Sequence, residues 1–186
     1  VYDIKNTLEL KEIIHGIIHK LENSYDGEKN PPDIQKLKGM IREFEEELVW
    51  AHFGVRVNNV NHLRLGFYTG DIFTAQPERN RDVLPILEEL RKYKPTTISL
   101  AFDPEGSGPD THYKVLQAIA EAVRLWGKEE DLSHLKIIGY RNVWFKFHPA
   151  EATNFVPVSL NSLSVLDSAF TDCYLSQVEA PFPSYM

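Results

Sequence analysis

The segment from Asp103 to His112 holds the side chains best suited to chemistry. It places three carboxylates, Asp103, Glu105 and Asp110, close to the imidazole of His112. Such a mixture can bind a zinc ion or move protons. Asp103-Pro104 is also an ordinary turn, and Asp110 is an ordinary residue for capping the start of a helix. From the residue types alone, a functional loop and a capped structural loop therefore remain equally open.

Two other patterns have both a functional and a structural interpretation. His15 and His19 lie four positions apart on a predicted helix, a spacing that can chelate a metal. Both flank an apolar stripe, so we favour the solvated edge of that helix as their place. Arg42 begins a charged run, which is usually a solvated helix face. Its planar guanidinium can instead bind a sugar or phosphate oxygen.

The elements around these residues predict an α/β domain. Apolar residues at three- and four-residue steps predict helices over residues 7–23, 31–53, 83–93, 110–126 and 160–177. Apolar and β-branched runs predict strands over 62–67, 96–102, 135–140, 143–147 and 155–158. The run over 96–102 lacks strict alternation, so we expect it to be covered on both faces of a parallel sheet. The loop from Asp103 then follows the carboxyl end of a strand, where open α/β sheets bind ligands.

Composition narrows the class of protein. With 186 residues, 42% of them hydrophobic, the chain fits one domain over residues 1–186. The net charge of −7 and the lack of a basic stripe argue against a nucleic-acid partner. No apolar run approaches the roughly 18 residues that a membrane span needs. The single Cys173 and the absence of a signal-peptide pattern predict a reducing compartment, hence a cytoplasmic protein.

Several motifs occur in the order found in the PIG-L/LmbE family of zinc-dependent sugar de-N-acetylases. The run Arg42-Glu43-Phe44-Glu45 resembles that family's Arg-x-x-Glu helix, and residues 65–70 resemble its Leu-Gly-Tyr-Pro-Asp-Gly segment. Asp110-Thr111-His112 is similar to its His-Pro-Asp-His helix start, and residues 156–177 to its last strand and helix. The sequence over 103–112 further resembles the corresponding loop of one subgroup. That subgroup consists of bacterial proteins related to glucosamine-6-phosphate deaminase that carry such a domain at their C-terminus.

The resemblance implies a three-layer Rossmann-like fold with a mostly parallel sheet, and a zinc ion that activates a water for attack on an N-acetyl carbonyl. It implies His112 as a zinc ligand and Arg42 as a sugar contact, with Asp110, Asp103 and Glu105 as catalytic candidates. The family's His-Pro-Asp-Asp motif is absent from these residues. We therefore expect a domain cut from a longer chain and lacking its first strand. Zinc would belong to the intact domain, and this chain alone would neither bind zinc tightly nor hydrolyse an amide.

These expectations lead to one preferred function and two alternatives. The preferred function is part of an amidohydrolase that de-N-acetylates an N-acetylglucosamine-type sugar in amino-sugar metabolism, with an amino sugar or sugar phosphate as its small-molecule partner. The first alternative is an accessory, sugar-binding domain of a glucosamine-6-phosphate deaminase-type protein. The second is an interaction domain without sugar chemistry. A missing strand would expose sheet edge and apolar surface, so self-association is also expected.

Overall fold

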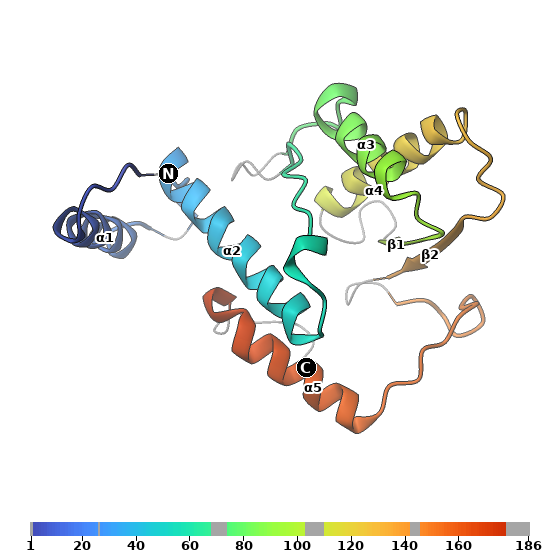
Figure 1. Ribbon diagram of the computed structural model, residues 1–186. Helices are drawn as coiled ribbons and strands as arrows, with labels where there is room; N and C mark the ends of the chain where they lie inside the picture. The colour runs from blue at the N-terminus through green and yellow to red at the C-terminus, as the bar shows by residue number, and fades with distance from the viewer. Residues whose placement is uncertain (1, 26, 68–73, 103–109, 142–145, 178–186) are drawn as a thin grey trace. The chain divides into compact units, whose positions relative to one another are not determined.

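The computed structural model describes residues 2–25, 27–67, 74–102, 110–141 and 146–177, and Figure 1 traces them from blue to red. The helices are α1 (Thr7–Glu22), α2 (Pro32–His52), α3 (Leu84–Tyr93), α4 (Asp110–Trp126) and α5 (Leu160–Cys173). The strands are β1 (Thr97–Ala101) and β2 (Lys136–Tyr140). Short helical turns complete the list at Val57–Asn59, Arg79–Val83 and Leu175–Gln177, the middle one being a π-helical turn.

The chain divides into two compact units. The first unit combines residues up to 61 with those from 159 to 180, and the second is formed chiefly by residues 62–158. The prediction of a single domain over 1–186 stays a prediction. No helix within the described ranges combines the length and the apolar character that crossing a bilayer requires.

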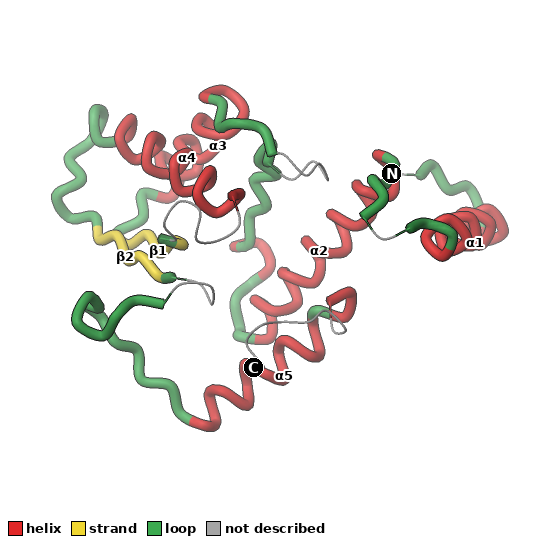
Figure 2. The backbone as a smooth tube through the Cα atoms, turned by 180° about the vertical axis from the view of Figure 1, so that it is seen from behind, coloured by secondary structure: helices red, strands yellow, loops and turns green. Residues whose placement is uncertain are grey.

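In the first unit, α2 and α5 lie side by side (Figures 1 and 2). Pro32 occupies the first turn of α2, where its missing N–H is not needed. Glu45 of α2 is buried, and its carboxylate accepts hydrogen bonds from the backbone N–H and the hydroxyl of Ser176, both at 2.7 Å. Next to it, the Tyr174 hydroxyl donates to Glu46. Two carboxylates of α2 therefore hold the segment that follows α5.

The start of α1 is capped by two side chains, one from the residue before the helix and one from its first turn. Asn6 is the N-cap, and its Oδ1 accepts from the backbone N–H groups of Leu8 and Glu9, both at 3.0 Å. Glu9 in turn accepts from the backbone N–H of Lys5 at 2.9 Å. This reciprocal pattern is close to a capping box. It fixes where α1 begins, although α1 has no buried residue.

The core of the second unit lies between α3, α4 and the segment around Phe67. Trp126 and Ala122 of α4 and Phe67 are fully buried there, together with Leu87 of α3. Beneath α4, β1 pairs with β2 in parallel, with Thr97 opposite Lys136 and Ala101 opposite Tyr140. The described part of the chain is thus α/β with a small parallel sheet, compatible with a Rossmann-like fold. The three-layer LmbE-type arrangement and the missing first strand stay predictions.

The segment over 62–67 is irregular, so the strand predicted there is wrong. Arg64 has a φ of 50°, which interrupts an extended chain. The backbone N–H of Gly66 donates to the Asp82 carboxylate at 2.9 Å instead of to a neighbouring strand. Asp82 is fully buried and also accepts from the backbone N–H of Glu78 at 2.8 Å and from the guanidinium of Arg81. A buried carboxylate therefore organises this part of the chain.

The structure bears on four further expectations about strands and helix ends. The strand predicted over 155–158 is wrong. This segment is irregular and no described strand pairs with it, and the Val156 side chain is 83% exposed. The strand predicted over 143–147 falls largely outside the described residues, and Lys146 and Phe147 are not in a strand. The last helix ends at Cys173, before the turn at Leu175–Gln177. In addition, β1 is covered on one face only, since Thr97 and Ser99 are exposed.

Candidate functional site

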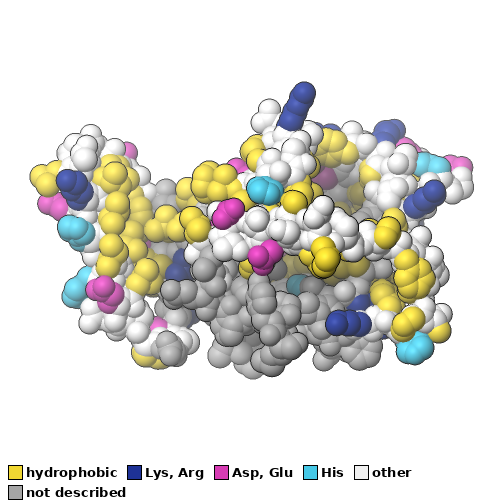
Figure 3. Space-filling view, turned by 90° about the horizontal axis from the view of Figure 1, so that it is seen from below, with side chains coloured by type: hydrophobic (Ala, Val, Ile, Leu, Met, Phe, Trp, Pro, Cys, Tyr) yellow, Lys and Arg dark blue, Asp and Glu magenta, His cyan; other side chains and the backbone are white. Residues whose placement is uncertain are grey.

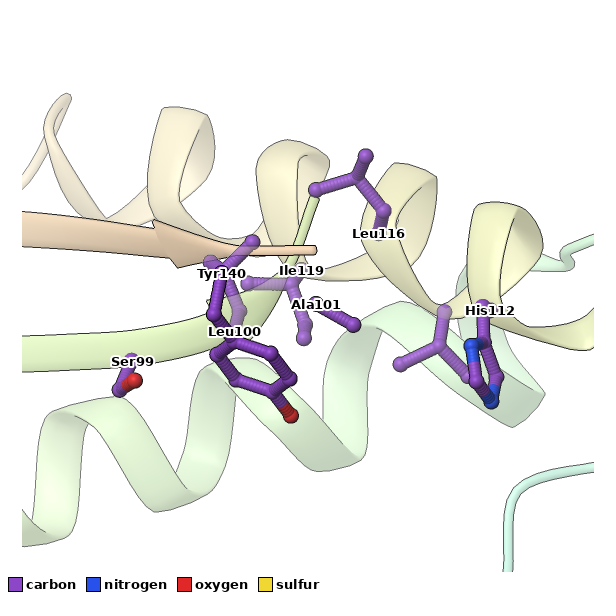
Figure 4. Close-up of a pocket in the computed structure, with 8 residues that line it drawn as sticks. Ser99, Leu100, Ala101, His112, Leu116, Ile119 and Tyr140 are labelled. Atoms are coloured by element: carbon purple, nitrogen blue, oxygen red, sulfur yellow. The ribbon is translucent and has the colours of Figure 1, made fainter. Parts of the chain in front are cut away.

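A pocket of about 330 Å³ lies between α4 and the two strands. Its lining residues come from β1, β2 and the first turns of α4 (Figure 4), and are Ser99, Leu100, Ala101, His112, Val115, Leu116, Ile119 and Tyr140. Ala101 and Tyr140 are the last residues of their strands, and His112 belongs to the first turn of α4. The pocket therefore lies at the carboxyl end of the parallel strands, as expected for an α/β ligand site.

The pocket combines an apolar wall with a few polar groups. In the view of Figure 4, Ser99 and His112 mark the two ends of the row of side chains, with the Tyr140 ring between them. The residue before Tyr140 is Gly139, and a larger residue would not fit there, since a Cβ would lie 2.9 Å from the Cβ of Phe102. Apolar walls with a small number of convergent polar groups are typical of small-molecule sites.

A network of polar contacts fixes the start of α4 beside this pocket. The Lys114 side chain is only 6% exposed, and its ammonium forms an ion pair with Asp110. The same ammonium donates to the backbone carbonyl of Thr74 at 2.8 Å, while the Thr74 hydroxyl donates to Asp110 at 2.7 Å. The hydrogen bond from Lys114, aided by that from Thr74, lowers the pKa of the Asp110 carboxyl below its usual value. Asp110 is thus held ionised in a structural contact, a poor starting point for a general base.

The structure brings only some of the predicted site residues together. His112 lines the pocket, and Asp110 lies two residues before it on the same helix turn. Asp103 and Glu105 lie outside the described residues. Arg42 is an exposed residue of α2 in the first unit. The roles proposed for these five residues stay predictions, although the contacts of Asp110 favour a structural role for it.

The described residues do not make up a zinc site by themselves. Across the described ranges, no three His, Cys, Asp or Glu side chains are grouped so that they could hold a metal ion. His112 is the imidazole of the pocket, and the nearby carboxylate of Asp110 is already paired with Lys114. Catalytic zinc ordinarily takes three protein ligands. Zinc in the intact domain stays a prediction.

Sequence reasoning missed Lys114, Thr74 and Tyr140. The spacing of Asp110 and Lys114, four positions on a helix, is the usual spacing of an ion pair and was readable from the sequence. Thr74 lies 40 residues before Lys114, and no local sequence pattern predicts the hydrogen bond between them. Tyr140 ends the strand predicted over 135–140, but its place in the wall of the pocket depends on the pairing of β2 with β1.

Comparison with known proteins gives one direction for function. The chain is 28% identical over 188 aligned residues to a protein of Bacteroides thetaiotaomicron whose name describes it as glucosamine-6-phosphate deaminase-like. The similarity covers 98% of this chain and 28% of that relative's length. No protein-family model matches the sequence, and no solved structure matches it significantly. Membership of the PIG-L/LmbE family stays a prediction, and the relative's name points no further than amino-sugar metabolism.

Proposed function

We propose that the pocket at the carboxyl end of β1 and β2 binds an amino sugar of the glucosamine type. The observation that carries this proposal is the position of His112, an imidazole in the first turn of α4 that opens onto a cavity at the ligand-binding edge of a parallel sheet. A volume of about 330 Å³ is at the small end of the range for ligand sites, which suits a single sugar ring. The relative's name supplies the sugar class.

The pocket offers complementary groups for such a ligand. The apolar wall formed by Leu100, Val115 and Ile119 would face the C–H groups of the ring or an N-acetyl methyl group. The His112 imidazole and the Tyr140 hydroxyl would exchange hydrogen bonds with ring hydroxyls or the nitrogen substituent. The first turn of α4 adds a partial positive charge, which favours an anionic substituent such as a phosphate.

The finer proposal is that the intact protein hydrolyses the N-acetyl group of this sugar. In that reaction His112 would help to hold a zinc ion, and the ion would supply Lewis-acid activation of the hydrolysis. Asp103 and Glu105 are the carboxylates proposed to assist it. A non-catalytic, sugar-binding role is the second candidate, and the ion pair between Asp110 and Lys114 favours it because that pair engages a carboxylate that catalysis would otherwise use.

Titrations followed by amide chemical shifts test the binding proposal. N-acetylglucosamine 6-phosphate and glucosamine 6-phosphate are added in turn to the chain kept free of metal by a chelator, with glucose 6-phosphate as the comparison sugar. We expect shifts at the ends of β1 and β2 and at the start of α4. His112→Ala should weaken binding about tenfold or more, in keeping with the loss of a hydrogen bond in a buried contact. His134→Ala, an exposed histidine outside the pocket, is the matched control.

The same variants separate binding from zinc chemistry. Zinc is titrated by calorimetry into the intact protein and into its His112→Ala and His15→Ala/His19→Ala variants. The intact protein is used because this chain alone is not expected to bind zinc tightly. The double variant is included because the two histidines of α1 could chelate zinc independently. Zinc binding that is lost only in His112→Ala would support the hydrolase proposal. Sugar binding without such zinc binding would support the sugar-binding domain. Absence of sugar binding, or binding that His112→Ala leaves unchanged, would refute the assignment of this pocket.

A further inference from the structure

Helix α1 presents an apolar stripe to solvent. Its members recur at three- and four-residue steps and are Leu10, Ile13, Ile14, Ile17, Ile18 and Leu21. No residue of α1 is buried, and the exposed fractions of Ile14 and Ile18 are 44% and 46%. Figure 3 shows a band of yellow side chains along α1, at the left-hand edge of the view. Short helices in water are stabilised mainly by burying such a stripe, so this one lacks its main source of stability.

The two borders of this stripe carry opposite charges at opposite ends. At about 100° per residue, Glu9 and Lys20 lie on one border, and Lys11 and Glu22 lie on the other. Each border therefore has one acidic and one basic side chain, separated by most of the length of the helix. When two copies of such a helix pair in antiparallel fashion, each border faces the same border of the other copy.

We propose that α1 pairs with α1 of a second copy of this chain in an antiparallel arrangement. In this pairing Glu9 faces Lys20 of the second copy, and Lys11 faces Glu22 of the second copy, so that the four charges on the two borders of each helix find an opposite charge. Opposed helix dipoles add to the attraction. This interface goes beyond the sugar pocket and does not depend on it.

Sedimentation of the whole 186-residue chain over a concentration series tests the pairing. We expect a monomer at low concentration and a dimer at high concentration. Ile17→Asp puts a charge in the centre of the stripe and should abolish the dimer without harming a core, because α1 has no buried residue. Leu8→Asp is the matched control: Leu8 is 69% exposed on the same helix but lies outside the stripe, and this variant should dimerise like the original chain. Circular dichroism checks that both variants keep their helix content.

Charge exchange tests the antiparallel arrangement. Lys11→Glu places two like-charged contacts in each dimer and should weaken dimerisation about tenfold, since each exposed contact contributes modestly and the symmetry doubles it. Adding Glu22→Lys to that variant should restore dimerisation. A chain that stays monomeric throughout would overturn the proposal, as would assembly that Ile17→Asp leaves intact. A double variant that dimerises no better than Lys11→Glu would also overturn it.

Discussion

The buried carboxylate of Asp82 should be the most costly single group to remove in the second unit. Its two oxygens accept from the backbone N–H groups of Gly66 and Glu78 and from Arg81, whose terminal nitrogen lies 2.7 Å away. Asp82→Asn keeps the shape but removes the charge, and it turns an NH₂ group toward a backbone donor. One buried donor is then left unsatisfied, and the ion pair with Arg81 is lost.

The size of the effect follows from these contacts. Breaking a buried ion pair costs about 3–5 kcal/mol, and leaving one buried donor without an acceptor costs about 1–3 kcal/mol. The Arg81 side chain is 34% exposed, so water can solvate the charge left behind and the upper values do not apply. We therefore expect Asp82→Asn to lower the free energy of unfolding by about 2–4 kcal/mol, measured by urea unfolding near neutral pH. Glu88→Gln, an exposed carboxylate of α3, is the control and should change it by less than about 0.5 kcal/mol.

Acid provides an independent check on the same reasoning. Burial acts to raise the pKa of Asp82, but the hydrogen bonds from Arg81 and from the amides of Glu78 and Gly66 outweigh it and leave the pKa below its ordinary value of 3.8. A lowered pKa contributes stability above 3.8 that is lost as the pH falls through the pKa of the folded state. The difference between the original chain and Asp82→Asn should thus be constant near neutral pH and shrink in acid. A loss under about 1 kcal/mol, or a difference that acid does not reduce, would refute the account.

Two further predictions concern other contacts of the fold. Burial and the hydrogen bond to Glu46 raise the pKa of Tyr174 above its usual value of 10.0, so this contact stabilises the fold below pH 10 and the contribution is lost as the pH rises further. Glu46→Gln should make Tyr174 ionise at lower pH in an absorbance titration of the tyrosines, and an unchanged curve would contradict this. Gly66→Ala places a Cβ 2.0 Å from Nε of Arg81 and should lower the free energy of unfolding by about 1–3 kcal/mol. Gly39→Ala, with open space around the new Cβ, should leave the free energy of unfolding unchanged.

Helices could be predicted from the sequence much better than strands. The three- and four-residue steps place α1, α2 and α4 within about two residues of their observed ends, because a helix satisfies its backbone hydrogen bonds locally. A strand needs a partner, which its own residues do not reveal. The run over 62–67 has strand-like residues, yet its backbone binds Asp82. The run over 155–158 has no described strand beside it.

The candidate site shows the same division between local and distant information. The place of His112 near the start of a helix that follows a strand could be predicted, because β1 and α4 follow one another in the sequence. The contact between Lys114 and Thr74 spans 40 residues, so only the folded chain brings the two together. The interpretation of Asp110 depends on both kinds of contact: its ion pair with Lys114 is local, at four-residue spacing, whereas the hydrogen bond that it accepts from Thr74 is distant in the sequence.

The first unit draws on both ends of the sequence, and this sets the order in which the protein can mature on the ribosome. Glu45 is synthesised 131 residues before Ser176, the residue that will satisfy its carboxylate. At about 5–20 residues per second, Ser176 is synthesised roughly 7–26 s after Glu45, and the intervening residues of the second unit are complete before it. The apolar face of α2 stays uncovered for most of that interval. Nascent chains of this protein should therefore present α2 to chaperones during that interval, and the second unit should be the first to resist protease.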